Sequence, residues 1–453
     1  MSDLLSIGAS GVSAYAGALA AIGNNVSNAD TPGYTRRDVT LEQNASADAT
    51  QAYYNHRTEF GGVLTTSVTR AGDSYLTAAA RNAASEAGET SMTATWLSNA
   101  ETALNDGATG VGQSATAFFN AGDQLAADPG NTGSQKQFLA SLDQTASAFR
   151  TTASDLADVS NGIANTAETT VQTVNSDLDA LDKVNAALNH QVAGSSSQAD
   201  LMDQRDRLID DLSSHLAVTV SVADNGTATV KLANSTVQLT ANLNNNASRA
   251  GARFAVAVGT NGTLSLQAVM AGASQAIAAP GGELGGLIDS AATVADRRNS
   301  LDKMATDFAT AVNNWQAAGV TTAGTSGAPL LSGTNAASLT LATSDPTAIA
   351  SGLASGATNG NLLTLSSLRG SGGLEQSWSA MVTDQGQMVA AANSANTAAQ
   401  SASSAANTAR GANTGVDLNT EAAKMIQYQQ AYDGAAKVIQ VAKDTMQSIF
   451  DLF

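Results

Sequence analysis

The feature that most constrains this chain is a pair of matching heptad patterns at its two ends. Near the start, apolar or aromatic residues lie on one helical stripe at Leu5, Val12, Tyr15, Leu19, Ile22 and Val26. Near the end, an interval of seven separates Leu418, Met425, Tyr432, Ile439, Met446 and Phe453. Such spacing aligns side chains along a helix. We therefore expect the two terminal helices to pair as a coiled coil, with everything between them as a long insertion.

The C-terminal pattern predicts a helix of roughly 30 residues, on the order of 45 Å long at the usual rise. Asp417 or Asn419 can cap its N-terminus, and Glu421 in the first turn suits the helix dipole. A single stripe of this kind is also typical of an ordinary core helix. The matching pair favours the coiled coil.

Between the ends, the period of the sequence changes twice. Residues 75–215 have apolar residues at helical spacing, interrupted at "AADPGNTGS". Residues 216–282 alternate β-branched and polar residues around Asn-Gly pairs at 225–226 and 261–262, which predicts two hairpins. The helical period then returns, followed by a Gly/Thr/Ser-rich segment near 319–375. Residues 376–415 are low in complexity and fit either a disordered linker or a helix with small side chains.

These shifts predict a mainly α chain with an inserted β domain. Its terminal domain comprises residues 1–60 and 416–453. A long antiparallel helix bundle comprises 61–215 and 283–415, with a small β and loop segment near 319–375, and a small all-β outer domain comprises 216–282.

Composition excludes several classes of protein. The formal net charge is −18 and no basic cluster can follow a phosphate backbone, so nucleic acid is not an expected partner. The chain has no cysteine, which excludes thiol catalysis and cysteine-ligated metals. Its three histidines lie in no recognisable catalytic or metal-binding motif. We expect no enzyme activity and no cofactor, and the Gly- and Ser-broken first helix does not suggest a membrane span or a cleaved signal.

One aspartate-rich string, "DLMDQRDRLIDD" at 200–211, resembles a metal or acid–base site at first sight. Its leucines and isoleucine fall at helical spacing, and Arg205 and Arg207 are available to pair with the acids. Charge runs of this kind usually form a solvated or ion-paired helix face. We therefore expect no catalytic or metal-binding residue here.

A second polar string, "NNVSNADTPGYTRRDV" at 24–39, follows the first helix. Asparagine tolerates left-handed backbone, and Pro-Gly suits the centre of a type II turn, so the chain is expected to reverse sharply here. The residues of this signature turn are Asn24, Asn25, Asn28, Thr31, Pro32, Gly33 and Tyr34.

The signature turn closely resembles the N-terminal signature of bacterial flagellar rod, hook and hook-associated proteins, and the last helix is similar to the closing helix of the same group. The middle of the chain distinguishes better between the members of this group. The segment "NAALNHQVAGSSSQADLMDQRDRLIDDLSSHLAVTV" resembles the hook-associated protein 1 family, in which a D-Q-R-D motif precedes the first strand; the motif here is Asp203, Gln204, Arg205 and Asp206. Two departures stand out: the family's usual Gln is Arg37 here, which we expect to change only a surface contact, and an additional outermost domain is not expected.

The resemblance implies a structural protein at the junction between flagellar hook and filament, assembled through its terminal helices. It also implies contacts with copies of itself, with hook protein, with hook-associated protein 3, and with an export chaperone at the C-terminal helix. Location outside the cell after type III export, without a cleaved signal, follows from the same resemblance. A rod or hook protein, and a non-flagellar surface adhesin or S-layer protein, remain alternatives.

Overall fold

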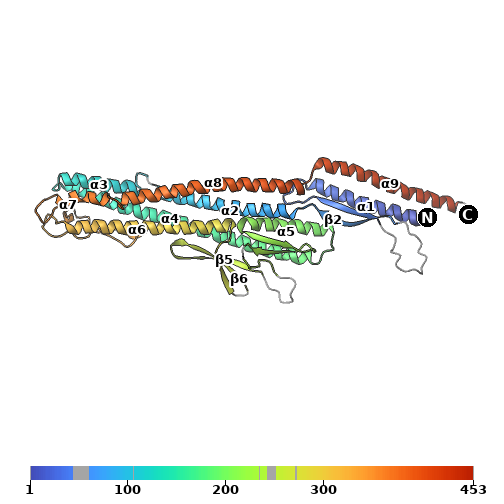
Figure 1. The fold of residues 1–453 in the computed structure, drawn as a ribbon, viewed down its shortest axis with the longest axis horizontal. Helices are drawn as coiled ribbons and strands as arrows, with labels where there is room; N and C mark the ends of the chain where they lie inside the picture. The colour runs from blue at the N-terminus through green and yellow to red at the C-terminus, as the bar shows by residue number, and fades with distance from the viewer. Residues whose placement is uncertain are drawn as a thin grey trace. The chain divides into compact units, whose positions relative to one another are not determined.

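The computed structural model describes residues 2–43, 61–105, 107–233, 235–241, 251–270 and 273–451, and the side chains from residue 4 onward within them. The predicted stripe residue Phe453 lies outside these residues. The chain is mainly helical with small sheets, as the sequence predicts (Figure 1). The helices are α1 Ser2–Ser27, α2 Ser74–Ala103, α3 Val111–Ala127, α4 Thr132–Leu188, α5 Ser196–His215, α6 Gly282–Ala318, α7 Gly360–Thr364, α8 Leu374–Thr414 and α9 Leu418–Phe450.

The strands form several small sheets rather than one large one. Their bounds are β1 Arg37–Gln43, β2 Val63–Arg70, β3 Val218–Val222, β4 Ala228–Leu232, β5 Arg253–Val258, β6 Leu264–Met270, β7 Ala273–Ile277, β8 Leu331–Ser332 and β9 Thr340–Leu341. Antiparallel β3 and β4 form the first predicted hairpin, with Gly226 in its turn at φ +87°. Around the second Asn-Gly pair, β5, β6 and β7 are neighbours in a three-stranded sheet.

The chain divides into two compact units. Unit 1 comprises residues 1–84, 175–253 and 400–453, and unit 2 comprises 85–174 and 254–399. The long helices α2, α4 and α8 each contribute residues to both units. The predicted three-domain division is not tested by this clustering and remains a prediction.

Unit 2 has an aromatic core. Phe118 of α3 is fully buried and lies 5.1 Å from the Phe138 ring of α4 and 5.7 Å from the Phe308 ring of α6. The α4 residues that share a seven-residue spacing, including Phe149, Leu156 and Ile163, are fully buried. The seven-residue spacing in the sequence therefore identifies core residues of this unit correctly.

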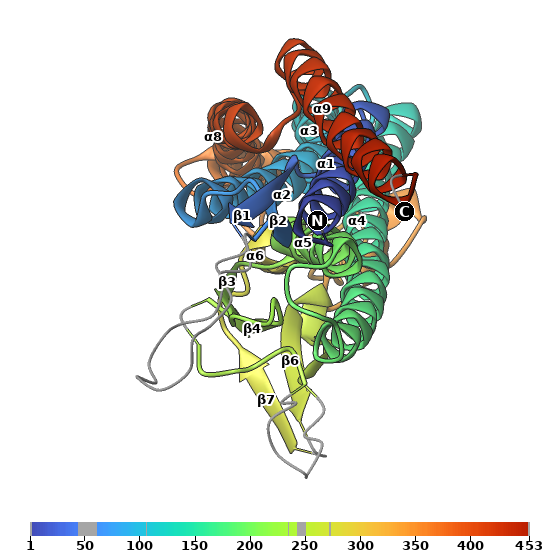
Figure 2. The same ribbon diagram turned by 90° about the vertical axis from the view of Figure 1, so that its right-hand side faces the viewer.

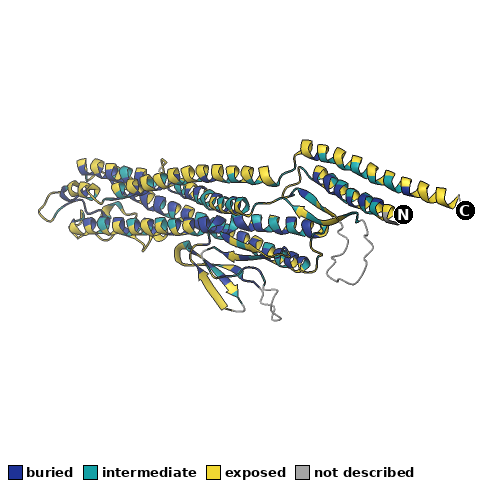
Figure 3. Cartoon of the chain, turned by 45° about the vertical axis from the view of Figure 1, so that its right-hand side comes forward, coloured by how far each residue is buried: buried dark blue, intermediate teal, exposed yellow. Residues whose placement is uncertain are grey.

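Residues 376–415 are helical rather than a disordered linker, because they lie almost entirely in α8. Figure 3 shows that much of α8 is exposed, which is consistent with a helix held by high alanine content rather than by a deep core. Residues 4–27 of α1 are long and apolar enough to cross a membrane by length and composition alone. A core helix can meet the same criteria of length and composition.

Unit 1 brings the two ends of the chain together. Helices α1 and α9 lie side by side in both views (Figures 1 and 2), and the hairpin of β1 and β2 packs against α1. Strand β1 pairs with β2 in antiparallel register, with Arg37 opposite Arg70. The expected meeting of the terminal helices is therefore observed.

Candidate functional site

Small residues of α1 form close contacts with α9. A Cβ added to Gly8 would lie 2.6 Å from Ile439 Cγ1, and one added to Gly11 would lie 3.0 Å from the Ala435 Cβ. Ala14 and Ala18 continue this face and are 2% exposed. The helices approach closely because this face of α1 carries little side-chain volume.

The heptad stripe of α1 is consequently only partly buried. Leu5 and Val26 are exposed, Val12, Tyr15 and Leu19 are half-buried, and Ile22 is buried. On α9, Leu418 and Met446 are exposed, and Met425, Tyr432 and Ile439 are half-buried. The rings of Tyr15 and Tyr428 lie 6.2 Å apart between the helices. Much of both stripes therefore remains available to a further partner.

The signature turn reverses the chain after α1, as predicted. The amide of Tyr34 donates to the Thr31 carbonyl at 3.1 Å, which closes a four-residue turn around Pro32 and Gly33. Gly33 has φ +73°, the left-handed conformation that the third residue of a type II turn requires. Asn28 accepts a hydrogen bond from the Thr31 hydroxyl, while Asn24 is exposed.

Asn25 ties the signature turn to both terminal helices. Its side chain is fully buried and uses two donors and two acceptor positions. The amide nitrogen donates to the Arg37 carbonyl at 2.8 Å and to Glu421 Oε2 at 2.9 Å. The amide oxygen accepts from the Tyr34 hydroxyl at 2.8 Å and from the Arg37 backbone at 2.9 Å. One side chain thus joins the end of α1, the start of β1 and the first turn of α9.

Asp203 joins two arginines that the sheet places side by side. Arg37 and Arg70 are opposite each other on β1 and β2, where like charges repel. Asp203 of α5 accepts from Arg37 Nη2 through Oδ2 at 2.7 Å and from Arg70 Nε through Oδ1 at 2.8 Å. Burial would lower the pKa of Arg37, but hydrogen bonds to Asp203 and Asp200 outweigh it and raise that pKa. The buried carboxylate therefore makes the cross-strand arginine pair possible.

Asp206 continues the network one helical turn further along α5. Its Oδ2 accepts from Arg70 Nη2 at 2.8 Å, and its Oδ1 accepts from Arg205 Nη2 at 2.7 Å. Burial opposes ionisation of Asp206, but the charges of Arg205 and Arg70 prevail and lower its pKa. Burial lowers the pKa of the Arg205 guanidinium, against the opposing effect of Asp206.

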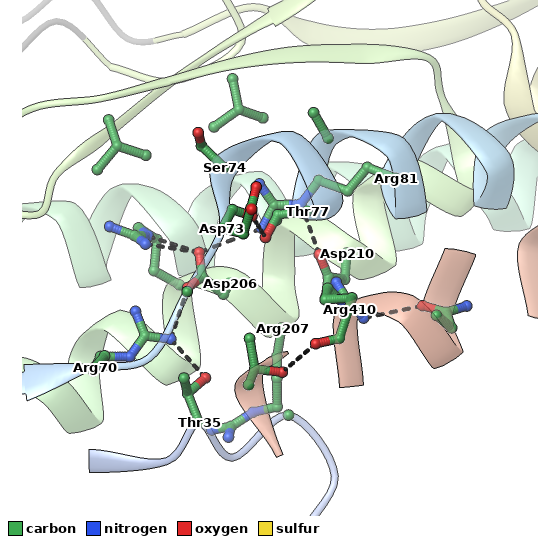
Figure 4. Close-up of a pocket in the computed structure, with 18 of the residues that line it drawn as sticks. Thr35, Arg70, Asp73, Ser74, Thr77, Arg81, Asp206, Arg207, Asp210 and Arg410 are labelled. Carbon is green, nitrogen blue, oxygen red and sulfur yellow. Dashed lines mark hydrogen bonds and ion pairs between the residues drawn. The ribbon is translucent and has the colours of Figure 1, made fainter. Parts of the chain in front are cut away.

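The network extends to α2, α8 and α9. Asp210 accepts from Arg81 of α2 and from Arg410 of α8, each at 2.7 Å (Figure 4). Lys424 of α9 donates to Asp38 of β1 at 2.5 Å, a bond that raises the lysine's pKa. We call the set the unit 1 network; its members are Asn25, Tyr34, Arg37, Asp38, Arg70, Arg81, Asp203, Arg205, Asp206, Asp210, Arg410, Glu421 and Lys424.

The network corrects one expectation and confirms another. Arg37 is not a surface substitution, because its side chain is 5% exposed and ion-paired with a carboxylate that is itself 4% exposed. The aspartate string on α5 is an ion-paired helix face, as predicted, although Asp203 and Arg205 are buried rather than solvated. Gln204 is exposed. Asp417 caps α9 as predicted, by accepting from the amides of Asn419 and Thr420.

The chemistry available to this network is structural. Among the residues that the structure describes, no group of three or more His, Cys, Asp or Glu side chains is placed to hold a metal ion. The three α5 aspartates of the unit 1 network face guanidinium groups at hydrogen-bond distance, and Asp38 and Glu421 pair with Lys424, so these carboxylates are committed to ion pairs. The arrangement fixes the ends of α1 and α9 to α5.

Comparison with protein families divides the chain into three matched segments. The model described as "Flagellar hook-associated protein FlgK helical domain" matches residues 97–330, just over half of the 453 residues. The model "Flagella basal body rod protein" matches residues 5–35. The model "Flagellar basal body rod FlgEFG protein C-terminal" matches residues 412–452. The two rod-protein matches cover nearly all of α1 with its signature turn and the whole of α9.

Curated relatives agree with this pattern. Proteins named flagellar hook-associated protein 1 are similar: that of Salmonella typhimurium is 26% identical over 236 residues, covering 52% of this chain and 42% of the relative. The Escherichia coli protein is 25% identical over 341 residues, covering 72% and 59%. The Bacillus subtilis protein is 30% identical over 234 residues, covering 50% and 46%. The chain therefore spans about half the length of the curated relatives it matches.

A solved structure is also similar. It is the flagellar hook junction protein FlgK from Burkholderia pseudomallei, with 21% identity and a TM-score of 0.49 over 57% of this chain and 46% of that chain.

Proposed function

Because this chain belongs to the family of flagellar hook-associated proteins that carry the FlgK helical domain, we propose that it is a structural protein of the bacterial flagellum and forms the junction ring between hook and filament. The observation that carries this proposal is the order of the family matches. Rod-protein signatures at the two ends flank the hook-associated helical domain. The role is one of assembly, and no catalytic role is proposed.

The terminal helices are the proposed assembly surface, acting together as a coiled coil. Their packing within one chain supports this role, because it uses the small-residue face of α1 and leaves apolar side chains on both helices exposed. Contiguous exposed apolar surface commonly marks a protein interface. The exposed large apolar residues of the two helices are Leu4, Leu5, Val26, Leu418, Ile426, Val441, Met446, Ile449 and Phe450.

The proposed assembly is a ring or tube of identical chains. A head-to-tail contact that does not close on itself generates a helical array, and long terminal helices packed on neighbouring copies can form its wall. In this proposal residues 1–60 with 416–453 form the terminal domain, 61–215 with 283–415 the helical domain, and 216–282 the inserted β domain.

The partners of such a ring are proposals that rest on the family. They are the hook protein on one side, hook-associated protein 3 on the other, and an export chaperone that binds the C-terminal helix before assembly. Type III export without a cleaved signal would deliver the chain. Deleting residues 416–453 tests the chaperone proposal: binding is expected to be lost, and unchanged binding would rule it out.

A rod or hook protein is the second candidate, since the ends of the chain match rod-protein models. The match of residues 97–330 to the hook-associated helical domain favours the junction role over this candidate. A surface adhesin or S-layer protein is a third candidate, and the flagellar family matches favour the other two over it.

Electron microscopy of a deletion strain separates these candidates. The junction role predicts complete hooks without filaments, together with flagellin released into the medium. Loss of hooks would indicate a rod or hook protein. Intact filaments would contradict any essential place in the flagellar axis.

A point substitution tests the assembly surface itself. Met446→Glu places a charge on an exposed position of the predicted α9 stripe, where it costs the isolated chain little but opposes burial against a second copy. We expect the strain to lose filaments while the purified chain unfolds at the same temperature as wild type. Gln447→Glu, on the neighbouring exposed position, is the matched control and is expected to retain filaments. Equal behaviour of the two variants would exclude the stripe as the assembly surface.

A further inference from the structure

Unit 1 contains a groove whose charge is opposite to that of the chain as a whole. Its volume is about 610 Å³, within the range of protein binding pockets. Five arginines line it, namely Arg70, Arg81, Arg205, Arg207 and Arg410, whereas its aspartates are Asp73, Asp206 and Asp210. Strand β3 also lines the groove, through Val218, Thr219, Val220 and Val222. We call this cavity, part of which Figure 4 shows, the arginine groove.

Four of the five arginines are already committed within the chain. Arg70, Arg81 and Arg205 bind Asp206, and Arg410 binds Asp210. Asp73 accepts from the amides of Tyr75 and Leu76 and so caps α2. These bonds hold the groove in shape and leave a net positive lining.

Arg207 is the fifth arginine of the groove, and it differs from the other four in its contacts. It is exposed, and no hydrogen bond or ion pair joins it to another of the described residues. Its stem is nevertheless placed by the signature turn, because a Cβ on Gly33 would lie 2.4 Å from Arg207 Cγ and 2.6 Å from Cδ. A guanidinium that is positioned by packing, carries no carboxylate partner and borders a cationic groove is suited to receive an external carboxylate.

The same chain carries a complementary surface on α4. Between Thr151 and Asp182 there is no Lys, Arg or His. Asp155, Asp158 and Glu168 are exposed on α4, with Asp155 next to the buried Leu156, and none forms an ion pair with another described residue. Asp155 and Glu168 are about 20 Å apart along the helix. We call these three residues the α4 acidic face; it belongs to unit 2.

We propose that the arginine groove of one copy binds the α4 acidic face of a second copy, with Glu168 of that face pairing with Arg207. The inference rests on the junction role proposed above, in which many copies meet. Charge complementarity selects the occupant: the chain has a net charge of −18, so another copy approaches the groove with an excess of carboxylates.

Such a contact is heterologous, since groove and acidic face are different surfaces of the chain. A heterologous contact adds copies in one direction and does not stop at a dimer. It would therefore set the direction in which copies are added to the array, while the terminal helices contribute apolar contacts. It would also orient incoming copies before apolar surfaces meet.

The test uses the absence of cysteine, which makes any introduced thiol unique. One full-length chain carries Ser74→Cys on the groove wall, and a second carries Thr169→Cys beside Glu168; both positions are exposed. The two purified chains are mixed at low ionic strength with a short bismaleimide linker. We expect the mixture to give a dimer that joins Cys at 74 to Cys at 169, identified by peptide mass spectrometry.

Charge reversal then identifies the pairing. Arg207→Glu in the first chain is expected to lower the yield of that dimer about tenfold, because like charges then meet in the contact. Glu168→Lys in the second chain is expected to restore much of the yield against Arg207→Glu. Asp224→Lys, on an exposed turn of unit 1 outside both surfaces, is the control and should restore nothing. Arg207→Lys should retain most of the yield.

Three results would overturn the inference: no dimer joining residues 74 and 169, a yield unchanged by Arg207→Glu, or equal restoration by Glu168→Lys and Asp224→Lys. Each of them leaves the junction role standing if the deletion strain still lacks filaments. Intact filaments in that strain would reject the junction role, whatever the cross-linking shows.

Discussion

The two terminal helices carry the same heptad pattern, yet the structure treats them differently. Helix α1 is held on several sides, by α9, by the β1–β2 hairpin and by the hydrogen bonds of Asn25. Among the described residues of α9, only Glu421 and Ala442 are buried, and Figure 3 shows a helix that is mostly exposed. Helix α1 is held by several contacts within its own chain, whereas α9 leaves most of its surface exposed.

The two terminal helices are held in place by different kinds of contact. Glu421, the buried residue of the first turn of α9, receives its hydrogen bond from Asn25, the buried residue at the end of α1. The anchor of α9 is therefore polar and lies at one end, whereas the rest of the helix depends on apolar contacts with small residues of α1. Disturbing the polar anchor should affect both helices, and disturbing the apolar contact should affect α9 more.

Replacing Asn25 should have the largest effect. Asn25→Ala removes four hydrogen bonds and leaves buried partners at Arg37, Tyr34 and Glu421 unsatisfied. Each unsatisfied buried group costs about 1–3 kcal/mol, so we expect unit 1 to lose about 4 kcal/mol of unfolding free energy. Chemical denaturation measures this. Asn24→Ala, at the exposed neighbouring asparagine, should cost less than about 0.5 kcal/mol; equal losses would contradict the account.

Replacing Asp203 should come next. Asp203→Ala leaves the facing Arg37 and Arg70 without the carboxylate between them, and breaking a buried pair costs about 3–5 kcal/mol. We expect about 3 kcal/mol, since Arg70 keeps Asp206 and Arg37 keeps Asp200.

Two variants sharpen this second comparison in the same denaturation experiment. Asp200→Ala removes an exposed partner of Arg37 and should cost less than about 1 kcal/mol. Arg37→Gln leaves Asp203 paired with Arg70 and should fall between the two. A larger loss for Asp200→Ala than for Asp203→Ala would show that the buried carboxylate is not the centre of the network.

Lowering the pH should reduce the stability that the unit 1 network contributes. The pKa of Asp206 is lowered in the folded chain, so its contribution to stability is present above the ordinary aspartate pKa of about 3.9 and is lost as pH falls below it. Unfolding temperature followed from pH 7 to pH 2 should therefore drop most steeply below about pH 4. Asp206→Asn should flatten part of that drop. An unchanged profile in this variant would remove Asp206 from the acid response.

Glycine-to-alanine substitutions in the two helices should have the smallest effects on stability, and the two effects should differ in sign. Gly434 of α9 has no atom within 4 Å of an added Cβ, so Gly434→Ala should stabilise the helix by about 0.5–1 kcal/mol. Gly8→Ala gains the same propensity but meets Ile439 Cγ1 at 2.6 Å, and we expect a net loss of about 1 kcal/mol. Circular dichroism during thermal unfolding compares them. Equal stabilisation by both would show that α1 and α9 do not depend on close approach.

The sequence predicts the elements of this fold well because they rest on local periodicity. The heptad spacing of α9, the seven-residue spacing of Phe149, Leu156 and Ile163, and the Asn-Gly turn at Gly226 each appear where the pattern places them. The signature turn is also local, and Gly33 adopts the conformation expected for it.

The unit 1 network was not predictable in the same way, because its members are distant in sequence. Arg37, Arg70, Asp203 and Arg410 lie on four different elements, and no spacing rule relates them. The available signal was the aspartate string on α5, for which the sequence offered Arg205 and Arg207 as partners. Arg205 does pair with Asp206, but the partners on other elements were not identified. The burial of Arg37 is explained by the buried Asp203 that faces it and by its second partner, Asp200.

Hydrogen exchange of the full chain, followed by mass spectrometry, tests the central claim most directly: that the unit 1 network anchors both ends of the chain. In the Asp203→Ala variant we predict faster exchange in peptides covering β1 and the first turn of α9, while α3 and the first half of α4 in unit 2 exchange as in wild type. Unchanged exchange at β1 and α9, or an equal increase throughout both units, would contradict it.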